Sequence, residues 1–337
     1  MTKNEVNDNL KAQYNAVDIF KFICALLVCT IHLAPFSSHI LKNANGVNFY
    51  IVNCLSRIAV PFFFTTAGFF LYKKANIEKP DTNIIKDYCF KLLRLIGIWW
   101  VLLFMGEKNH LWYLGSLVIS ILLITLLLNK KIKIKYIIII TLLLYIIGLL
   151  GDSYYDITRM FKNSPILNNI ITNYETYFKT TRNGIFFSPV FVAIGALIAS
   201  NKVKINLKLS YFGAIISFYL LVTEVFILSH YFHPKDYNMF ISLVPLMFFT
   251  LNTLINIKLK DRKSYKILRI MSILIYFMHR FFIYYSNILL KHLRMNYHIN
   301  LYDYQFLIVI ILTITVSFII EKLSKTKKLE LFKYLYT

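Results

Sequence analysis

Three ionisable residues stand in an apolar stretch near the start of the chain, DIFKFICALLVCTIHL: Asp18, Lys21 and His32. On an α-helix, Lys21 and His32 point in directions about 20° apart and lie roughly 16 Å apart along the axis. Asp18 precedes Lys21 by three residues, which allows an ion pair. Ionisable groups inside a membrane span are costly, so their presence there suggests a functional site. We therefore take His32 as a candidate general base, and Asp18 and Lys21 as further candidates for the catalytic site. The alternatives are snorkelling of Asp18 and Lys21 at the interface and a structural histidine.

A second apolar stretch, SRIAVPFFFTTAGFF, contains Arg57, Pro61 and Gly68. A buried arginine needs a partner, proline interrupts the helical hydrogen bonds, and glycine permits a close neighbour. We therefore expect a bent, tightly packed span with a kink at Pro61. The following stretch, YCFKLLRLIGIWW, places Lys91 and Arg94 on one helical face at the membrane surface. This pair suits a phosphate group, although an ordinary positive flank is an equal alternative.

Later apolar segments carry further polar residues at their starts or interiors. His110, Trp112 and Tyr113 begin one segment, where they either line the mouth of a site or mark the membrane interface. Arg182 and Asn183 open another, and His279 and Arg280 lie well inside a late one. The four cysteines show no CxxC spacing, so we expect no disulfide and no metal site.

The composition is that of an integral membrane protein. Hydrophobic residues make up 58% of the 337 residues, charged residues 16%, and the mean hydropathy is +0.58. Apolar runs close to the roughly 20 residues that cross a bilayer recur along the chain. We predict an all-α, polytopic bundle of about ten transmembrane helices, over 17–37, 49–72, 92–106, 111–128, 136–150, 184–200, 209–229, 238–257, 268–290 and 305–320.

The distribution of basic residues predicts the orientation of these spans. With the N-terminus inside, cytoplasmic segments hold 26 of the 38 Lys and Arg residues and the opposite segments hold 9. Both termini are then cytoplasmic, with segment 1–16 before a transmembrane domain of 17–320 and a tail of 321–337. Segment 151–183 lies outside and is expected to be a folded lid or short helices. The net charge of +22 is dispersed among loops, which favours anionic lipid headgroups and argues against a nucleic-acid partner.

Four of these features together resemble the acyltransferase-3 family of membrane proteins. They are Lys21 with His32, the R-x-x-VPFFF-x-x-x-G pattern that begins at Arg57, the pair Lys91 and Arg94, and LIYFMH, which ends at His279. The resemblance implies about ten spans and transfer of an acyl group from cytoplasmic acyl-CoA to an acceptor beyond the membrane. It also implies that His32 is catalytic and that Lys91, Arg94 and Lys21 receive the phosphates of CoA.

The middle of the chain is similar to the membrane half of VanT-type membrane-bound serine racemases of vancomycin resistance, in particular the VanG-cluster form. The motifs are HLWYL (110–114), GLLGDSYY (148–155) and TTRNGIFFSPVF (180–191). In that family a cytoplasmic, pyridoxal-phosphate-dependent racemase domain follows the membrane domain, which supplies L-serine for D-serine production. The resemblance implies that residues 321–337 are the junction to such a domain, in the cytoplasmic membrane of a bacterium.

The two resemblances lead to alternative functions. Serine supply needs a cation for the carboxylate, from Arg57, Arg182 or Arg280, and an acid for the ammonium, from Glu224, Asp18 or Asp152. The alternative is an acyl-CoA-dependent O-acyltransferase that modifies a cell-envelope acceptor. An inert anchor has no use for the buried Arg57 and His32. We expect no cofactor bound to this chain in the first case and acyl-CoA as donor in the second, with pyridoxal phosphate only in a racemase domain. A monomer and a homodimer both remain open.

Overall fold

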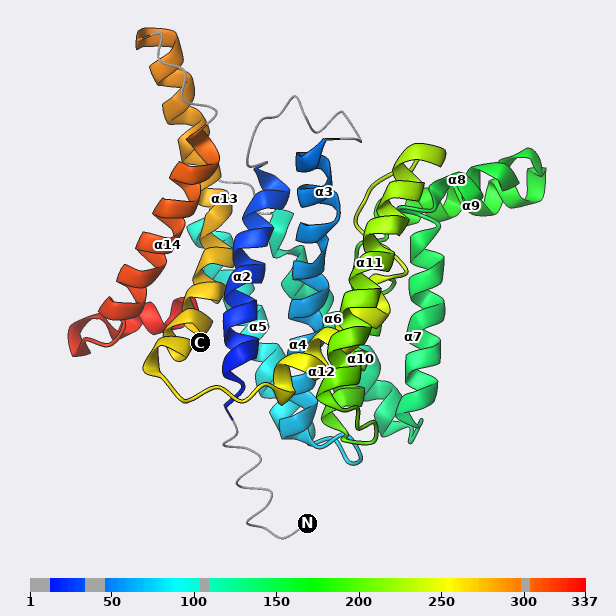
Figure 1. The fold of residues 1–337 in the computed structure, drawn as a ribbon, viewed down its shortest axis with the longest axis horizontal. Helices are drawn as coiled ribbons and strands as arrows, with labels where there is room; N and C mark the ends of the chain where they lie inside the picture. The colour runs from blue at the N-terminus through cyan, green and yellow to red at the C-terminus, as the bar shows by residue number, and fades with distance from the viewer. Residues whose placement is uncertain (1–12, 34–45, 104–108, 298–303) are drawn as a thin grey trace.

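A computed structural model describes residues 13–33, 46–103, 109–297 and 304–337 (Figure 1). Throughout these residues the secondary structure is helical, without a β-strand, which confirms the predicted all-α class. The α-helices are α2 (Asn15–His32), α3 (Val47–Asn53), α4 (Ala59–Ala75), α5 (Thr82–Leu102), α6 (Trp112–Asn129), α7 (Ile134–Leu149), α8 (Tyr155–Met160), α9 (Pro165–Tyr177), α10 (Ser188–Ala199), α11 (Leu207–Tyr231), α12 (Leu243–Asn256), α13 (Lys263–Tyr297) and α14 (Gln305–Leu323). Short 3₁₀ segments are η2 (Leu55–Ile58), η3 (Asn109–Leu111), η4 (Phe161–Asn163) and η6 (Lys327–Leu335).

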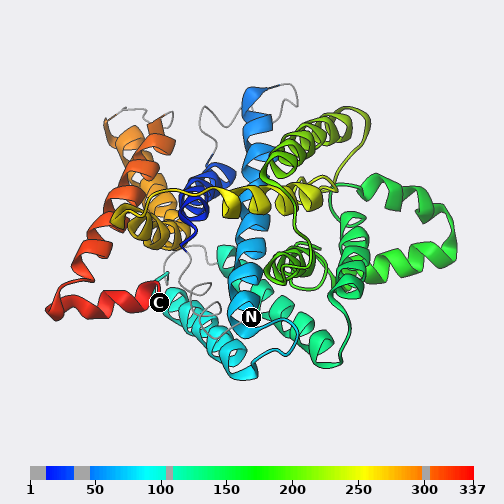
Figure 2. The ribbon, with the colours of Figure 1, turned by 60° about the horizontal axis from the view of Figure 1, so that its bottom comes forward.

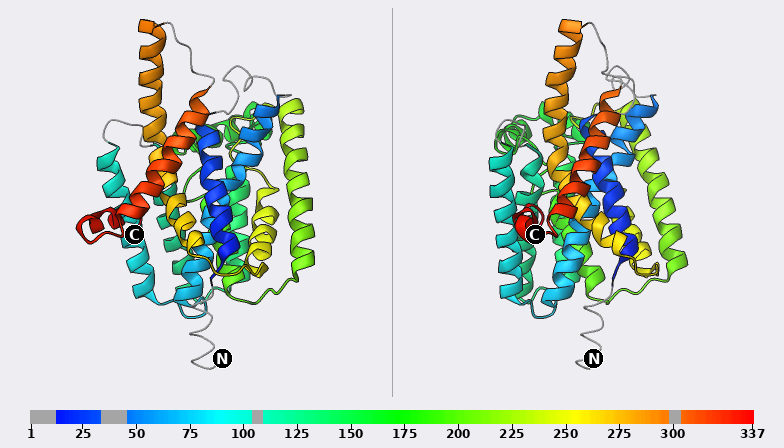
Figure 3. Two further views of the ribbon diagram at one scale, coloured as in Figure 1. Left: turned by 60° about the vertical axis from the view of Figure 1, so that its left-hand side comes forward. Right: turned by 90° about the vertical axis from the view of Figure 1, so that its left-hand side faces the viewer.

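The long helices form a bundle whose axes run roughly in one direction, as the two side views show (Figure 3). Within the part of the chain that the structure describes, six segments are long and apolar enough to cross a membrane: α2, Val47–Ala75 (which comprises α3, η2 and α4), α6, α11, α13 and α14. Helices α7, α10 and α12 are apolar but shorter, and α5 carries Lys91 and Arg94. A helix overlaps each of the ten predicted segments, so the membrane bundle is supported, while ten crossings and cytoplasmic termini stay predictions.

The second predicted span is broken at a different place from the one expected. The break is the short η2 turn between α3 and α4, and Pro61 lies just after it, in the first turn of α4. Proline is tolerated there because the first backbone N–H groups of a helix have no intrahelical partner. The predicted kink at Pro61 is therefore wrong by about one turn, although the span is bent.

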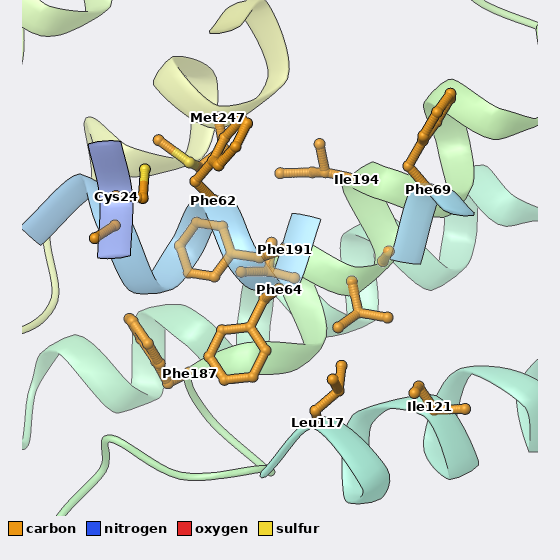
Figure 4. Packing of buried hydrophobic residues seen from close by; sticks show 14 of the residues in the cluster. Cys24, Phe62, Phe64, Phe69, Leu117, Ile121, Phe187, Phe191, Ile194 and Met247 are labelled. Atoms are coloured by element: carbon orange, nitrogen blue, oxygen red, sulfur yellow. The ribbon is translucent and has the colours of Figure 1, made fainter. Parts of the chain in front are cut away.

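The centre of the bundle is the crossing of α4 and α10. A Cβ atom added to Gly68 would overlap the backbone of Val192, and one added to Gly195 would overlap the backbone of Thr65. The two glycines let the helix backbones touch, as predicted for Gly68. Around this crossing the buried aromatic side chains interdigitate with aliphatic ones; the labelled set is Cys24, Phe62, Phe64, Phe69, Leu117, Ile121, Phe187, Phe191, Ile194 and Met247 (Figure 4).

Two peripheral features flank the bundle. Helices α8 and α9 project sideways from it, at the right of Figure 1, which confirms short helices in segment 151–183. At the other side, η6 lies against α5: Trp99 Nε1 donates to the carbonyl of Leu335 at 3.0 Å. Seen from the end of the bundle, α2 lies beside α13, the pairing that positions the candidate site (Figure 2).

Candidate functional site

The last turn of α2 meets the middle of α13 through three side chains. Arg280 Nη1 donates to His32 Nδ1 at 3.2 Å. The ring of His279 stacks on that of His32, with centroids 5.2 Å apart and planes 24° apart. His279 is fully buried and His32 partly buried. The structure thus brings His32 together with His279 and Arg280, which lie 247 and 248 positions later in the sequence.

The hydrogen bonds decide where each histidine carries its proton. A guanidinium can only donate, so His32 Nδ1 accepts, and a neutral His32 carries its proton on Nε2. Carbonyl oxygens can only accept, so His279 Nδ1 donates to the carbonyl of Tyr276 at 2.6 Å and that of Ile275 at 3.3 Å. His279 Nε2 is then an acceptor. His32 offers a donor at Nε2 instead of the lone pair that a general base needs.

A third histidine, His110, completes the cluster from the η3 turn. Its ring lies 5.2 Å from that of His279 and 5.7 Å from that of Tyr276. The hydroxyl of Tyr276 donates to the backbone carbonyl of His110. These contacts fix the turn before α6 against α13, so His110 lies inside the site, consistent with the mouth-lining alternative.

Next to the histidines, two arginines share one amide. Arg57 Nη1 and Arg182 Nη1 both donate to Asn238 Oδ1, the second at 2.9 Å. Arg57 Nη2 also donates to Asn53 Oδ1 at 3.0 Å. The guanidinium of Arg182 lies over the Trp112 ring at 4.9 Å. Arg280 thus contacts the histidine cluster, and Arg57 and Arg182 form a second cationic group at Asn238; each arrangement favours an anionic group.

The acids that we considered as ammonium partners are engaged elsewhere. Asp152 Oδ1 accepts from the backbone N–H groups of Asn238 and Met239 at 2.8 and 3.0 Å, and Oδ2 accepts from the Asn238 amide at 3.1 Å. Burial and then the charge of Asp236 raise the pKa of the Asp152 carboxyl above its ordinary value, which the hydrogen bonds from Asn238 and Met239 oppose. Asp152 is thus a buried clamp that orients Asn238.

Glu224 has a similar structural role at the start of α12. It accepts hydrogen bonds from the Tyr154 hydroxyl at 2.7 Å and from the backbone N–H groups of Ile241 and Ser242 at 2.7 and 2.9 Å. These donors precede or begin a helix, where backbone N–H groups otherwise lack partners. The carboxylate therefore caps α12 and ties it to α11.

At the opposite end of α2, Asp18 forms a bidentate ion pair with Arg269 of α13. Arg269 Nε lies 2.8 Å from Asp18 Oδ1, and Nη2 lies 2.5 Å from Oδ2. The structure therefore pairs Asp18 with Arg269 instead of Lys21. The Lys21 ammonium lies 4.6 Å from the centre of the Phe70 ring, a cation–π distance.

A cavity of about 370 Å³ opens beside this ion pair. Three cationic side chains line it: Lys21, Lys91 and Arg269. The remaining wall is mostly apolar and aromatic and includes Tyr113 and Tyr276, the latter in ring contact with His110. The cavity thus extends from a basic end toward the histidine cluster.

Two expected site residues, Arg94 and Asn183, make structural contacts instead of lining this cavity. Arg94 does not line the cavity with Lys91: its Nη2 donates to the backbone carbonyl of Thr337 at 2.6 Å. Asn183 Oδ1 accepts from the backbone N–H groups of Ile185 and Phe186 at 2.9 and 3.0 Å, as a turn cap. Only Lys91 of the predicted phosphate pair therefore faces the cavity.

Two residues of the site were not foreseen. Arg269 lies at the very start of the predicted span 268–290, where a basic residue is ordinary, and its buried partner lies 251 positions away. Asn238 stands at the start of a predicted span with no flanking signal. Only their distant partners reveal them.

Comparison with known proteins agrees with this architecture. A family model described as an acyltransferase domain, the acyltransferase-3 family, matches residues 14–107 and 108–322. The chain belongs to this family. The matched region contains the histidine cluster, the arginines and the three cationic side chains of the cavity.

Curated relatives add a second similarity. An amino-acid racemase of Enterococcus faecalis is 32% identical over 284 residues, which cover 78% of this chain and 38% of the relative. A serine/alanine racemase of Enterococcus gallinarum is 28% identical over 259 residues, which cover 69% of this chain and 36% of the relative. The chain therefore matches less than two fifths of these relatives' length. No solved structure matches the chain.

Proposed function

We propose that this chain is the membrane domain of a VanT-like protein and supplies L-serine across the cytoplasmic membrane to a fused racemase domain, for D-serine production in vancomycin resistance. The observation that carries the proposal is the contact of Arg280 with His32 inside a membrane bundle in which Arg57 and Arg182 share the Asn238 amide. Charged groups at such a depth are retained for function, and guanidinium groups bind carboxylates well. The racemase relatives support the same reading.

Uptake by the purified chain in proteoliposomes tests this proposal. We expect labelled L-serine to accumulate with the parent chain, and Arg182→Gln or Arg280→Gln to reduce uptake about ten- to hundredfold, the usual worth of a charge-assisted hydrogen bond. The control is Arg159→Gln, which changes an exposed arginine that pairs with Asp156. Uptake no higher than in empty liposomes, or equal uptake in all four proteins, would reject the proposal.

A second candidate, acyl transfer from acyl-CoA, is favoured by the basic cavity. Lys21, Lys91 and Arg269 would bind the phosphates, and the apolar wall would hold the acyl arm on the way to the histidines. Lys91→Gln should weaken acyl-CoA binding several-fold and make the residual affinity less dependent on salt. Arg94→Gln, which removes a cation outside the cavity, should change binding little. If Lys91→Gln and Arg94→Gln weaken acyl-CoA binding equally, the cavity is not the acyl-CoA site.

His32 separates the two candidates. If it hydrogen-bonds a passing substrate through Nε2–H, His32→Gln keeps an amide donor and should retain much of the uptake. If it takes part in acyl transfer, both His32→Gln and His32→Ala should abolish turnover, because an amide neither accepts a proton nor carries an acyl group. Uptake and acyl-CoA turnover are measured side by side, with thermal stability as the check on folding. Parent-like behaviour of both variants in both assays would make His32 structural.

A further inference from the structure

The Nε2 atom of His279 is a buried polar atom whose partner is missing. The side chain is fully buried, and Nε2 has no hydrogen-bond partner among the residues that the structure describes. Because Nδ1 donates to the carbonyl of Tyr276, Nε2 carries the lone pair and can only accept. A buried acceptor without a partner destabilises the fold, so we take it to indicate a donor that arrives with a ligand.

The surroundings of His279 restrict what that donor can be. The rings of His32 and His110 lie 5.2 Å away on two sides. Arg280 donates to His32, and the guanidinium of Arg182 lies over the ring of Trp112, two residues after His110. Among these positive charges a cationic donor is repelled, whereas a neutral hydroxyl on a molecule with an anionic group is suited to both features.

We propose that His279 Nε2 accepts a hydrogen bond from the hydroxyl group of the substrate, while the arginines bind its carboxylate. His279 would then make the site select small hydroxylated carboxylates, such as L-serine, over the same molecule without the hydroxyl, L-alanine. L-Alanine would leave the acceptor unpaired in a buried site, and sites of this kind discriminate strongly against the analogue that lacks the donor. This inference rests on the proposed function and adds a specificity-determining residue to it.

The experiment compares uptake of L-serine and L-alanine by proteoliposomes that contain the parent chain, His279→Leu, His279→Gln or the control His292→Gln. His292 lies on the same helix and is exposed. We expect the parent to prefer L-serine and His279→Leu to lower the serine-to-alanine ratio about tenfold or more, through loss of L-serine uptake. His279→Gln should keep part of the preference, because its amide oxygen can accept. The control should keep all of it.

A binding measurement on the parent chain alone makes the test independent of how the variants fold. L-Serine should raise the melting temperature of the purified protein more than L-alanine does at the same concentration. Equal stabilisation by the two amino acids, or an unchanged uptake ratio in folded His279→Leu, overturns the inference while the proposed function stands. No uptake of L-serine by the parent overturns the proposed function and this inference with it.

Discussion

The contact of α4 with α10 and the contact of α2 with α13 are among the most extensive helix pairings of the bundle. They differ in the kind of side chain that makes the contact. The first is apolar, and Gly68 and Gly195 let two backbones touch. The second carries an ion pair at one end and histidines at the other. Close packing of backbones and apolar side chains holds α4 against α10. In α2 and α13 the polar groups either satisfy one another, as Asp18 and Arg269 do, or leave an atom open to a ligand.

The largest expected effect is at the ion pair. Arg269→Ala should lower the free energy of unfolding by about 3 kcal/mol, because it leaves the carboxylate of Asp18, whose side chain is 2% exposed, without its partner. Asp18→Ala should cost less, since Arg269 is 46% exposed and can turn to water. The double variant should be more stable than Arg269→Ala.

Unfolding of the purified protein in detergent measures these differences as a double-mutant cycle. The control is Lys266→Ala, an exposed lysine one turn before Arg269 on the same helix. If the double variant loses the sum of the two single losses in free energy of unfolding, the two side chains do not stabilise the fold as a pair. The contrast between a satisfied ion pair at one end of α2 and an unsatisfied histidine site at the other would then fail.

The apolar pairing can be broken at its glycines. Gly195→Ala and Gly68→Ala should each lower the free energy of unfolding by about 1–3 kcal/mol, because the added methyl group meets backbone atoms that cannot move aside alone. Gly97→Ala in α5 is the matched control: nothing lies within 4 Å of its new methyl group. It should be neutral or slightly stabilising, by up to about 1 kcal/mol. If all three variants melt alike, close packing of α4 and α10 is not what holds them.

The smallest effect is expected outside both pairings, at the contact of Asp156 in α8 with His233. The backbone N–H of His233 donates to Asp156 and lowers the pKa of its carboxyl below the ordinary value of 3.8, with the His233 ring and Arg159 adding to it. A lowered pKa stabilises the fold above the ordinary pKa, and this contribution is lost as the pH falls through the lowered value.

Melting temperatures of the parent and Asp156→Asn between pH 7 and pH 3 check this. The parent should be slightly more stable at pH 7, and the difference should shrink as the pH drops below about 4. If the difference in melting temperature between the parent and Asp156→Asn grows on acidification, the Asp156–His233 contact does not stabilise the fold in the way stated.

The sequence by itself determined the membrane class, the apolar segments and the residues worth testing. Length and hydropathy set these, since a bilayer requires about 20 apolar helical residues whatever their neighbours are. His32, His279 and Arg280 stood out in the same way, because ionisable groups are rare at such depth. The close approach of a neighbouring helix at Gly68 could also be predicted, because a glycine stands there in a run of aromatic residues.

Only the tertiary structure decided which of these residues meet. Asp18 pairs with Arg269 across 251 positions instead of with Lys21 three positions away, because a bidentate guanidinium on the neighbouring helix satisfies both carboxylate oxygens. Lys91 faces the cavity and Arg94 the segment near Thr337, although helical spacing puts both on one side of α5. The protonated nitrogen of each histidine likewise depends on a donor or carbonyl that the fold supplies. Spacing along a chain specifies the face of one helix, whereas the partner across an interface depends on how whole helices pack, and local pattern does not contain that.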